Sequence, residues 1–194
     1  MSGPRRWTPL ETELLQDCAV FTVSRTATRS PEGGTHDFYR IDSADWVNVV
    51  PLTGSGEVVM IRQYRHGLRD LTLEIPGGLI DAGEEPAAAA GRELTEETGY
   101  RAAELVPIGA TNPNPALFGN RVHTFLATGL EHVGPPSNPG HEETVVELVP
   151  EAELRGIVRA GGVDHALVIA ALHFLDLHRE ALGSAARSPS SGPR

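Results

Sequence analysis

Three carboxylates and one guanidinium lie within residues 92–97, at spacings that bring them together on a helix. Glu93 and Glu97 are four residues apart, and Glu93 and Glu96 are three apart. Residues at these spacings are neighbours on one side of an α-helix. The carboxylates repel one another there, so we expect something positive beside them. Oxygen ligands of this kind suit Mg²⁺ or Mn²⁺, whereas zinc prefers histidine or cysteine.

Arg92 is the candidate for a brace between these acids. It precedes Glu96 by four residues and follows Glu84 by eight, which is close enough to contact one carboxylate and set its rotamer. A glutamate-rich helix with a solvated face would have the same composition. On these residues alone both interpretations stay open.

The elements around these residues predict how they are positioned. A turn at Gly77 and Gly78 leads into a helix from about Glu85 to Thr98. Pro86 suits its first turn, because the N–H that proline lacks would be unpaired there, and Gly99 suits the left-handed position after the last turn. The less polar side of this helix, which we expect to pack on a core, consists of Ala87, Ala90, Leu94 and Thr98.

The spacing continues through the whole stretch: Gly78, five residues, Glu84, seven residues, Arg92-Glu93-Leu94, one residue, Glu96-Glu97, one residue and Gly99. This pattern resembles the Nudix box, the signature of hydrolases that cleave a nucleoside diphosphate linked to another moiety. Every fixed polar and glycine position matches. The one departure is Tyr100, where the family prefers an aliphatic residue, and that position packs in the core. The resemblance implies an α/β fold, a Nudix-type α/β/α sandwich on a mixed sheet.

The same resemblance implies a metal site. In the family pattern Glu93 and Glu97 are the principal metal ligands, Glu96 is a further ligand, and a backbone carbonyl near Gly78 completes the shell. The expected cofactor is Mg²⁺, with Mn²⁺ as the alternative. Metal ions that bridge both phosphates neutralise the charge that repels a nucleophile, and they orient a water.

Other positions of the box and of a later loop carry supporting roles by resemblance. Glu84 and Arg92 orient the metal ligands, Arg92 as part of the catalytic set, and Gly99 has a structural role in the box. In the related branch the base that activates water lies on a loop after the box. Glu143 is the first candidate for that base and Glu142 the second, and geometry must decide between them.

Residues outside the box indicate the substrate class. Gln63-Tyr64-Arg65, followed by Leu73 to Gly78, is similar to the ADP-ribose and nucleoside-diphosphate-sugar pyrophosphatase branch. Pro115 lies sixteen residues after Gly99, where that branch places a proline, and the long loop from Pro135 to Glu143 also resembles it. The resemblance implies a Mg²⁺-dependent hydrolase that releases a nucleoside monophosphate and a sugar phosphate.

Four residues are candidates for binding this substrate: Arg65, Glu74, Pro115 and Arg121. Arg65 and Arg121 are planar donors suited to phosphate, although a surface salt bridge is the alternative for each. Glu74 could pair with such an arginine or contact the nucleotide. Three neighbours of Pro115, namely Asn112, Pro113 and Asn114, would line the same side of the site together with Asn120.

Composition limits the remaining possibilities. The chain has 194 residues and a formal net charge of −10, and all 16 basic residues are arginine. This balance argues against a protein that coats nucleic acid. Cys18 is the only cysteine, which excludes a disulfide within the chain and favours a cytoplasmic location. No apolar run reaches membrane-spanning length, so we expect no membrane partner.

Alternating and apolar runs predict the order of elements. Strands at 18–28 and 37–41 would form a hairpin around the turn at 30–36, after a short strand or turn at 7–15. Further strands are expected at 46–52, 57–64, 71–75, 105–111, 120–128 and 144–149. A helix at about 151–160 would end at Gly161, and Asp164 would cap a last helix at 163–178.

These elements give three regions. Residues 1–43 form an N-terminal β-hairpin extension, residues 44–182 the Nudix hydrolase domain, and residues 183–194 a disordered tail. In the related branch such a hairpin commonly exchanges across a homodimer, whose partner completes the active site, so we expect a dimer. Two alternatives stay open: a Nudix hydrolase of a dinucleoside polyphosphate, modified nucleotide or 5′-capped RNA, and a domain that senses a nucleotide without cleaving it.

Overall fold

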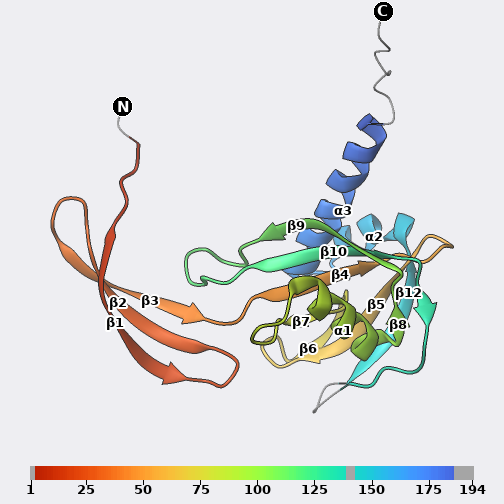
Figure 1. Cartoon of the computed structure of the whole chain (residues 1–194), viewed down its shortest axis with the longest axis horizontal. Coiled ribbons are helices and arrows are strands. Elements are labelled where there is room, and N and C mark those ends of the chain that lie inside the picture. Colours follow the sequence, from red (N-terminus) through yellow and green to blue (C-terminus); the bar gives the residue numbers. More distant parts are fainter. Residues whose placement is uncertain (1–2, 139–142, 186–194) are drawn as a thin grey trace, which may run out of the picture. The chain divides into compact units, whose positions relative to one another are not determined.

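The computed structural model describes residues 3–138 and 143–185, and its elements are labelled in Figure 1. The chain divides into two compact units. The first consists of residues 1–45 together with residues 112–121, and the second of residues 46–111 and 122–194. The short segment 112–121 is therefore grouped with residues 1–45 by its contacts.

The first unit contains a three-stranded antiparallel sheet in the order β1-β2-β3. Its strands are β1 (Thr8–Asp17), β2 (Thr22–Arg29) and β3 (Thr35–Asp42). The predicted hairpin is present as β2 and β3, joined by a turn in which Gly33 has φ of 99°. Of the two alternatives before the hairpin, a short strand or a turn, the structure has a strand, β1, which is longer than expected and is paired along β2. All ten of its residues are exposed, so no buried face marked it in the sequence.

The segment 112–121 is fastened to this unit by backbone and amide contacts. Asn112 Nδ2 donates to the carbonyl oxygens of Phe118 (3.1 Å) and Asn120 (3.0 Å), which closes the loop on itself. The Ile41 N–H donates to the Leu117 carbonyl at 2.8 Å, which joins the loop to β3. The loop conformation therefore depends on Asn112.

The second unit is built on two sheets. The first is mixed, in the order β7 (Gly77–Leu79), β4 (Trp46–Pro51), β10 (Val122–Thr128), β9 (Glu104–Thr111). β4 and β10 are parallel, and the outer pairs are antiparallel. The second sheet is antiparallel, in the order β12 (Thr144–Pro150), β5 (Glu57–Arg65), β6 (Asp70–Glu74). A short ladder joins β11 (Glu131–His132) to β8 (Tyr100–Arg101).

β4 and β5 are consecutive strands that lie in different sheets. The turn between them closes with the Gly56 N–H donating to the Thr53 carbonyl at 3.1 Å. A single bridge between Leu52 and Val58 follows, after which the two strands separate. This tight turn at residues 53–56 therefore lies at the junction of the two sheets.

The helices are α1 (Pro86–Thr98), α2 (Glu151–Arg159) and α3 (Ala166–Ala185). Alternate residues of β4 show how they are layered, because side chains alternate between the two faces of a strand. Val47 and Val49 belong to a buried cluster with Ala89, Ala90 and Leu94 of α1. Val50 belongs to a second cluster with Val168, Ala171 and Leu175 of α3. Helices thus cover both faces of the mixed sheet, and the predicted α/β/α sandwich is confirmed.

The predicted limits of α1 are confirmed, and three of the four residues predicted to pack on the core, Ala90, Leu94 and Thr98, are buried. Glu85 has extended backbone and precedes the first turn, and Gly99 has φ of 72° with its N–H on the Thr95 carbonyl at 2.9 Å. Ala87, predicted to pack on the core, is exposed, and Ala89 is buried in its place. Tyr100 is half-buried against the α1 cluster, as expected for that position.

The ends of the C-terminal helices differ from the sequence prediction in two places. His165, rather than Asp164, precedes the first turn of α3, and its Nδ1 accepts the Leu167 N–H at 3.3 Å. α3 also includes residues 183–185, which we had assigned to the tail, because alanine and leucine continue the helix beyond the last core contact. Residues 186–194 lie outside the described residues. None of the helices described is long and apolar enough to cross a membrane.

Candidate catalytic and metal-binding site

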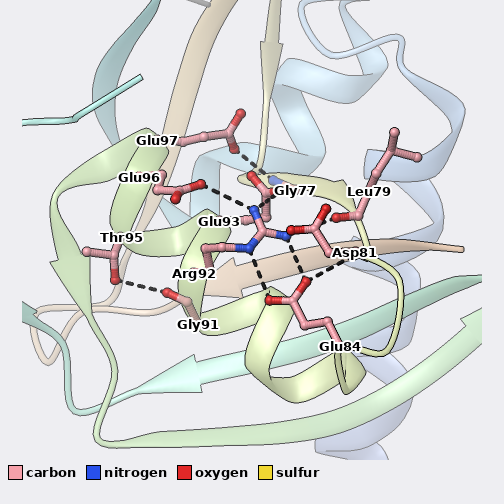
Figure 2. Close-up of polar contacts among 10 residues, drawn as sticks. All are labelled: Gly77, Leu79, Asp81, Glu84, Gly91, Arg92, Glu93, Thr95, Glu96 and Glu97. Atoms are coloured by element: carbon pink, nitrogen blue, oxygen red, sulfur yellow. Dashed lines mark hydrogen bonds and ion pairs between the residues drawn. The ribbon is translucent and has the colours of Figure 1, made fainter. Parts of the chain in front are cut away.

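Arg92 is the centre of the polar cluster on α1 (Figure 2). Its Nε donates to Glu84 Oε1 at 3.0 Å and its Nη2 to Glu84 Oε2 at 2.9 Å. Nη1 donates to Glu93 Oε1 at 2.7 Å and to Glu96 Oε2 at 3.2 Å. Nη2 also donates to the Leu79 carbonyl at 3.0 Å, so that one guanidinium joins the turn before the helix to two of its acids. We predicted a brace on one carboxylate, and Arg92 contacts three.

Glu97 is held from the opposite side by the backbone of β7. The Gly77 N–H donates to Glu97 Oε2 at 2.8 Å. Gly77 itself is fixed by pairing with Asn48 in β4. A side chain at Gly78 would overlap the carboxylate of Glu93, and one at Gly77 would overlap the Val47 carbonyl. Gly77 is therefore required by the close approach of the turn to β4, and Gly78 leaves the space that the Glu93 carboxylate occupies.

The acids of this cluster differ in burial. Glu97 is 3% exposed and Glu93 is 8% exposed, whereas Glu96 is half-buried. α1 is thus buried on its acidic side as well as on its alanine side. The hydrogen bonds from Arg92 lower the pKa of Glu84, and those to Glu84 raise the pKa of Arg92. Three carboxylates contact the one guanidinium and Glu97 is held by a backbone N–H, so these residues together carry an excess of negative charge.

The chemistry of the donor set can be tested against a divalent metal ion. In the part of the chain that the structure describes, no three acidic, histidine or cysteine side chains are already arranged as metal ligands. Glu93 and Glu96 turn toward Arg92, and Glu97 toward the Gly77 N–H. The predicted convergence of the three carboxylates is therefore not seen. Their oxygens nevertheless fit a hard divalent cation, because buried carboxylates in excess of their counter-charge need one.

A later segment of the chain wraps the C-terminal end of α1. The Val133 N–H donates to the Gly99 carbonyl at 2.8 Å, and the Ser137 N–H to the Glu96 carbonyl at 2.8 Å. After the undescribed residues 139–142, the Thr144 hydroxyl lies 2.8 Å from the Glu97 carbonyl oxygen. Both flanks of this loop are thus fixed to the turn of the helix that carries the acids.

The two candidate bases fall differently with respect to this loop. Glu143 is exposed and directly precedes β12, one residue before the contact of Thr144 with α1. Glu142 lies outside the described residues. Sequence reasoning missed Thr144, because a threonine at the start of a strand gives no signal of a helix contact.

Residues 43–172, more than half of the chain, match the NUDIX domain family. The chain belongs to the Nudix family. This Nudix chain is similar to the ADP-ribose pyrophosphatase of Mycobacterium tuberculosis (strain ATCC 25618 / H37Rv), with 32% identity over 183 residues that cover 93% of the chain and 87% of that protein. It is 36% identical to the ADP-ribose pyrophosphatase of Bacillus subtilis (strain 168) over 138 residues, 70% of the chain and 74% of that protein. Among solved structures, an ADP compounds hydrolase superposes with a TM-score of 0.81 and 25% identity, covering 97% of this chain and all of that one.

Arg65 and Glu74 of the Nudix chain pair with each other. Arg65 Nε and Nη2 donate to the two carboxylate oxygens of Glu74, each at 2.7 Å, and the Thr72 hydroxyl donates to Glu74 Oε1 at 2.6 Å. Burial by itself would raise the pKa of Glu74, but these hydrogen bonds outweigh it and the pKa is lowered. Arg65 therefore forms the salt bridge given above as its alternative role, and Glu74 pairs with an arginine as predicted.

Pro115 and Arg121 belong to the first unit, whereas the Nudix box belongs to the second. The Arg121 N–H donates to Asp45 Oδ1 at 2.8 Å. Pro115 lines a pocket of the first unit with Phe38 and Tyr39 of β3. The two residues therefore share a unit with the N-terminal sheet.

Proposed function

We propose that this chain is a metal-dependent Nudix hydrolase that cleaves ADP-ribose, or a related nucleoside diphosphate sugar, to a nucleoside monophosphate and a sugar phosphate. The observation that carries the proposal is the cluster of Glu84, Glu93, Glu96 and Glu97 around Arg92. The names of the two bacterial relatives, both ADP-ribose pyrophosphatases, support the substrate class.

Mg²⁺ is the proposed metal, with Mn²⁺ as the alternative, and Glu93 and Glu97 are its principal ligands. Glu96 and a backbone carbonyl near Gly78 complete the set. A divalent cation bound there would neutralise the diphosphate and lower the pKa of the attacking water. The chain's own contribution is to hold the acids in place: Arg92 restrains Glu93 and Glu96, and the Gly77 N–H restrains Glu97.

Glu143 is the proposed general base that removes the proton from the attacking water, and Glu142 is the second choice. The position of Glu143 supports this role, since Glu143 is exposed and directly precedes Thr144, which contacts the acidic helix. For substrate binding we propose Arg65 and Arg121 as donors to phosphate. In this role Arg65 would keep its fork on Glu74.

We further propose that residues 1–43 form the dimer interface of a catalytic domain at residues 44–182, in a cytoplasmic enzyme. The sheet of the first unit exposes large apolar side chains, which are unfavourable in water and typical of protein interfaces. They are Trp7, Leu10, Leu14, Leu15, Val20, Phe38 and Tyr39. A symmetric dimer would bury the same patch on both copies.

The test is product analysis after incubation of the protein and Mg²⁺ with ADP-ribose, GDP-mannose, UDP-glucose, a diadenosine polyphosphate and a nucleoside triphosphate. We expect a monophosphate and a sugar phosphate from ADP-ribose or a sugar nucleotide. Glu97→Gln should lower kcat at least about 100-fold, because it removes a metal-ligand charge but keeps an oxygen for the Gly77 N–H. Glu104→Gln, at an exposed position of β9, is the matched control and should keep full activity.

Other outcomes would redirect the proposal. Cleavage of only triphosphates or polyphosphates would contradict the substrate class while leaving the Nudix site in place. No turnover of any substrate, together with nucleotide binding that needs no Mg²⁺, would indicate a sensing domain. Equal activity of Glu97→Gln and the wild-type chain would rule out the proposed metal ligand.

A further inference from the structure

Gln63 in β5 has a buried amide nitrogen that forms no hydrogen bond with any described residue. Its side chain is 7% exposed, and its Nε2 has no hydrogen-bond partner among the residues described. The amide nitrogen carries two N–H donors. Buried donors without a partner are rare in folded proteins because they lose their hydrogen bonds to water. Gln63 comes two residues after Ile61, the last of the buried run from Val58, at a buried position where an apolar residue would have been favoured.

The strand register places Gln63 on the side of the sheet that faces the acidic helix. Gln63 lies directly opposite Thr144 of β12 and opposite Thr72 of β6. Residues directly opposite in antiparallel strands project from the same face. The Thr144 hydroxyl lies 2.8 Å from the Glu97 carbonyl oxygen, so this is the face that α1 covers. Gln63 is therefore the middle residue of a polar row beneath the C-terminal half of α1.

The two neighbours in this row are already engaged. The Thr144 hydroxyl contacts α1 and Asn138 Oδ1, and the Thr72 hydroxyl donates to Glu74. The carboxylate of Glu74 also accepts two hydrogen bonds from Arg65. None of these groups accepts a hydrogen bond from the Gln63 amide nitrogen, so the described residues leave its two N–H donors unused.

We propose that Gln63 is a substrate-binding residue whose amide donates a hydrogen bond to an anionic oxygen of the bound diphosphate. This assignment rests on the proposed function, which brings a diphosphate to the acids of α1. A neutral donor suits the position. A cationic side chain at this position would form an ion pair with a nearby carboxylate, as Arg65 does with Glu74 and Arg92 does with Glu84. A neutral amide is attracted to carboxylates less strongly, so its N–H groups stay available to a ligand.

Substitution by methionine separates ligand binding from a structural role. Methionine has nearly the length of glutamine and no donors, so Gln63→Met removes the buried unpaired group without leaving a large cavity. We expect the melting temperature of the ligand-free protein to stay the same or rise. We expect the affinity for the non-hydrolysable α,β-methylene analogue of ADP-ribose, measured by calorimetry with Mg²⁺, to fall at least about tenfold, since a hydrogen bond to a charged group is lost.

Two further variants complete the test. Gln63→Glu keeps the size but replaces the donors with a negative charge, so it should weaken binding of the analogue more than Gln63→Met does. Tyr64→Phe changes the next residue of β5, which is exposed and points to the other face, and should bind like the wild type. A change in affinity of less than about twofold in Gln63→Met would overturn the assignment.

A fall in the melting temperature of Gln63→Met would overturn it as well, because the amide would then have a partner inside the protein. Failure of the proposed function would look different from either result. In that case the wild-type chain itself would not bind the analogue, and the assignment of Gln63 would fall with it.

Discussion

Arg92 makes a set of contacts that no other side chain can reproduce. Its planar fork spans both oxygens of Glu84, while its remaining donors reach Glu93, Glu96 and the Leu79 carbonyl. A lysine has the same charge but only one nitrogen, which cannot lie in all these directions. The geometry of the acids therefore depends on the shape of this residue as well as on its charge.

Arg92→Lys should lower the free energy of unfolding by about 1–3 kcal/mol, because hydrogen bonds to partly buried carboxylates are lost while the charge remains. Urea unfolding measures this change. Arg155→Lys is the matched control, since the Arg155 side chain is 78% exposed against 29% for Arg92, and it also pairs with an acid, Asp176. The control should change the unfolding free energy by less than about 1 kcal/mol. Equal effects of the two substitutions would contradict the role of Arg92.

Residue types and spacing were enough to locate this cluster, but not to orient it. The positions of Glu93, Glu96 and Glu97 on one helix follow from their spacing, and the structure confirms that they share a neighbourhood. The direction of each carboxylate depends on contacts from outside the helix, such as the Gly77 N–H in β7. The role of Gln63 was likewise invisible, because it depends on the register of β5 with β12.

At the scale of the element, the limits of α1 are the best predicted of any helix, and its C-terminal end is held by contacts from another segment of the chain. Its limits follow from Pro86 and Gly99, whose preferences are local. Its packing could not be predicted in full, because the C-terminal end is wrapped by a segment more than thirty residues later in the chain. The backbone of Gly134 lies so close that a side chain at Gly99 would overlap its carbonyl oxygen. Only a glycine fits this position, because the backbone of Gly134, which lies outside the helix, leaves no space for a side chain.

Gly99→Ala should therefore lower the free energy of unfolding by more than about 2 kcal/mol, since left-handed backbone strain is added to a steric overlap. Gly161→Ala provides the comparison. Gly161 also has positive φ, at 77°, but nothing lies within 4 Å of an added Cβ, so only about 1 kcal/mol of strain is expected. Thermal unfolding of both variants gives the difference. A loss of unfolding free energy at Gly99 no larger than that at Gly161 would contradict the prediction, because it would mean that the segment at Gly134 moves away from the added methyl group without cost.

Strand predictions stayed open where burial gave no pattern. β1 has ten exposed residues, so a search for a buried face finds nothing, and only its pairing with β2 reveals it. β4 and β5, by contrast, are strongly apolar and were located within a residue or two of their ends. Their assignment to separate sheets could not follow from the sequence, since each is paired with a distant strand.

At the scale of the whole molecule, the exposed apolar side chains of the first unit lead to a prediction about assembly. Leu14 of β1 is 61% exposed, and we expect it to lie in a dimer interface. Leu14→Glu should shift the protein from dimer to monomer, because a charge in an apolar interface loses hydration without gaining a partner. Light scattering after size-exclusion chromatography, over a range of protein concentrations, measures the shift.

Leu182→Glu is the matched control for this prediction. Leu182 of α3 is 59% exposed, so the same change of residue occurs at almost the same exposure but in the second unit. The control should assemble like the wild-type chain. A wild-type protein that is monomeric at every concentration would refute the proposed dimer outright.

The parallel pair of β4 and β10 has a consequence for how the chain is made. On the ribosome β4 emerges early, yet the strand that covers its edge ends only at Thr128, after β5, β6, β7, α1 and β9 have been synthesised. Until then Val47, Val49 and Val50, fully buried in the finished protein, lack their central partner strand. Long-range pairing of this kind forms slowly and leaves apolar strands open to aggregation. The acidic helix is thus synthesised before the sheet that supports it is complete, and a nascent chain stalled before β10 is one that chaperones would need to hold.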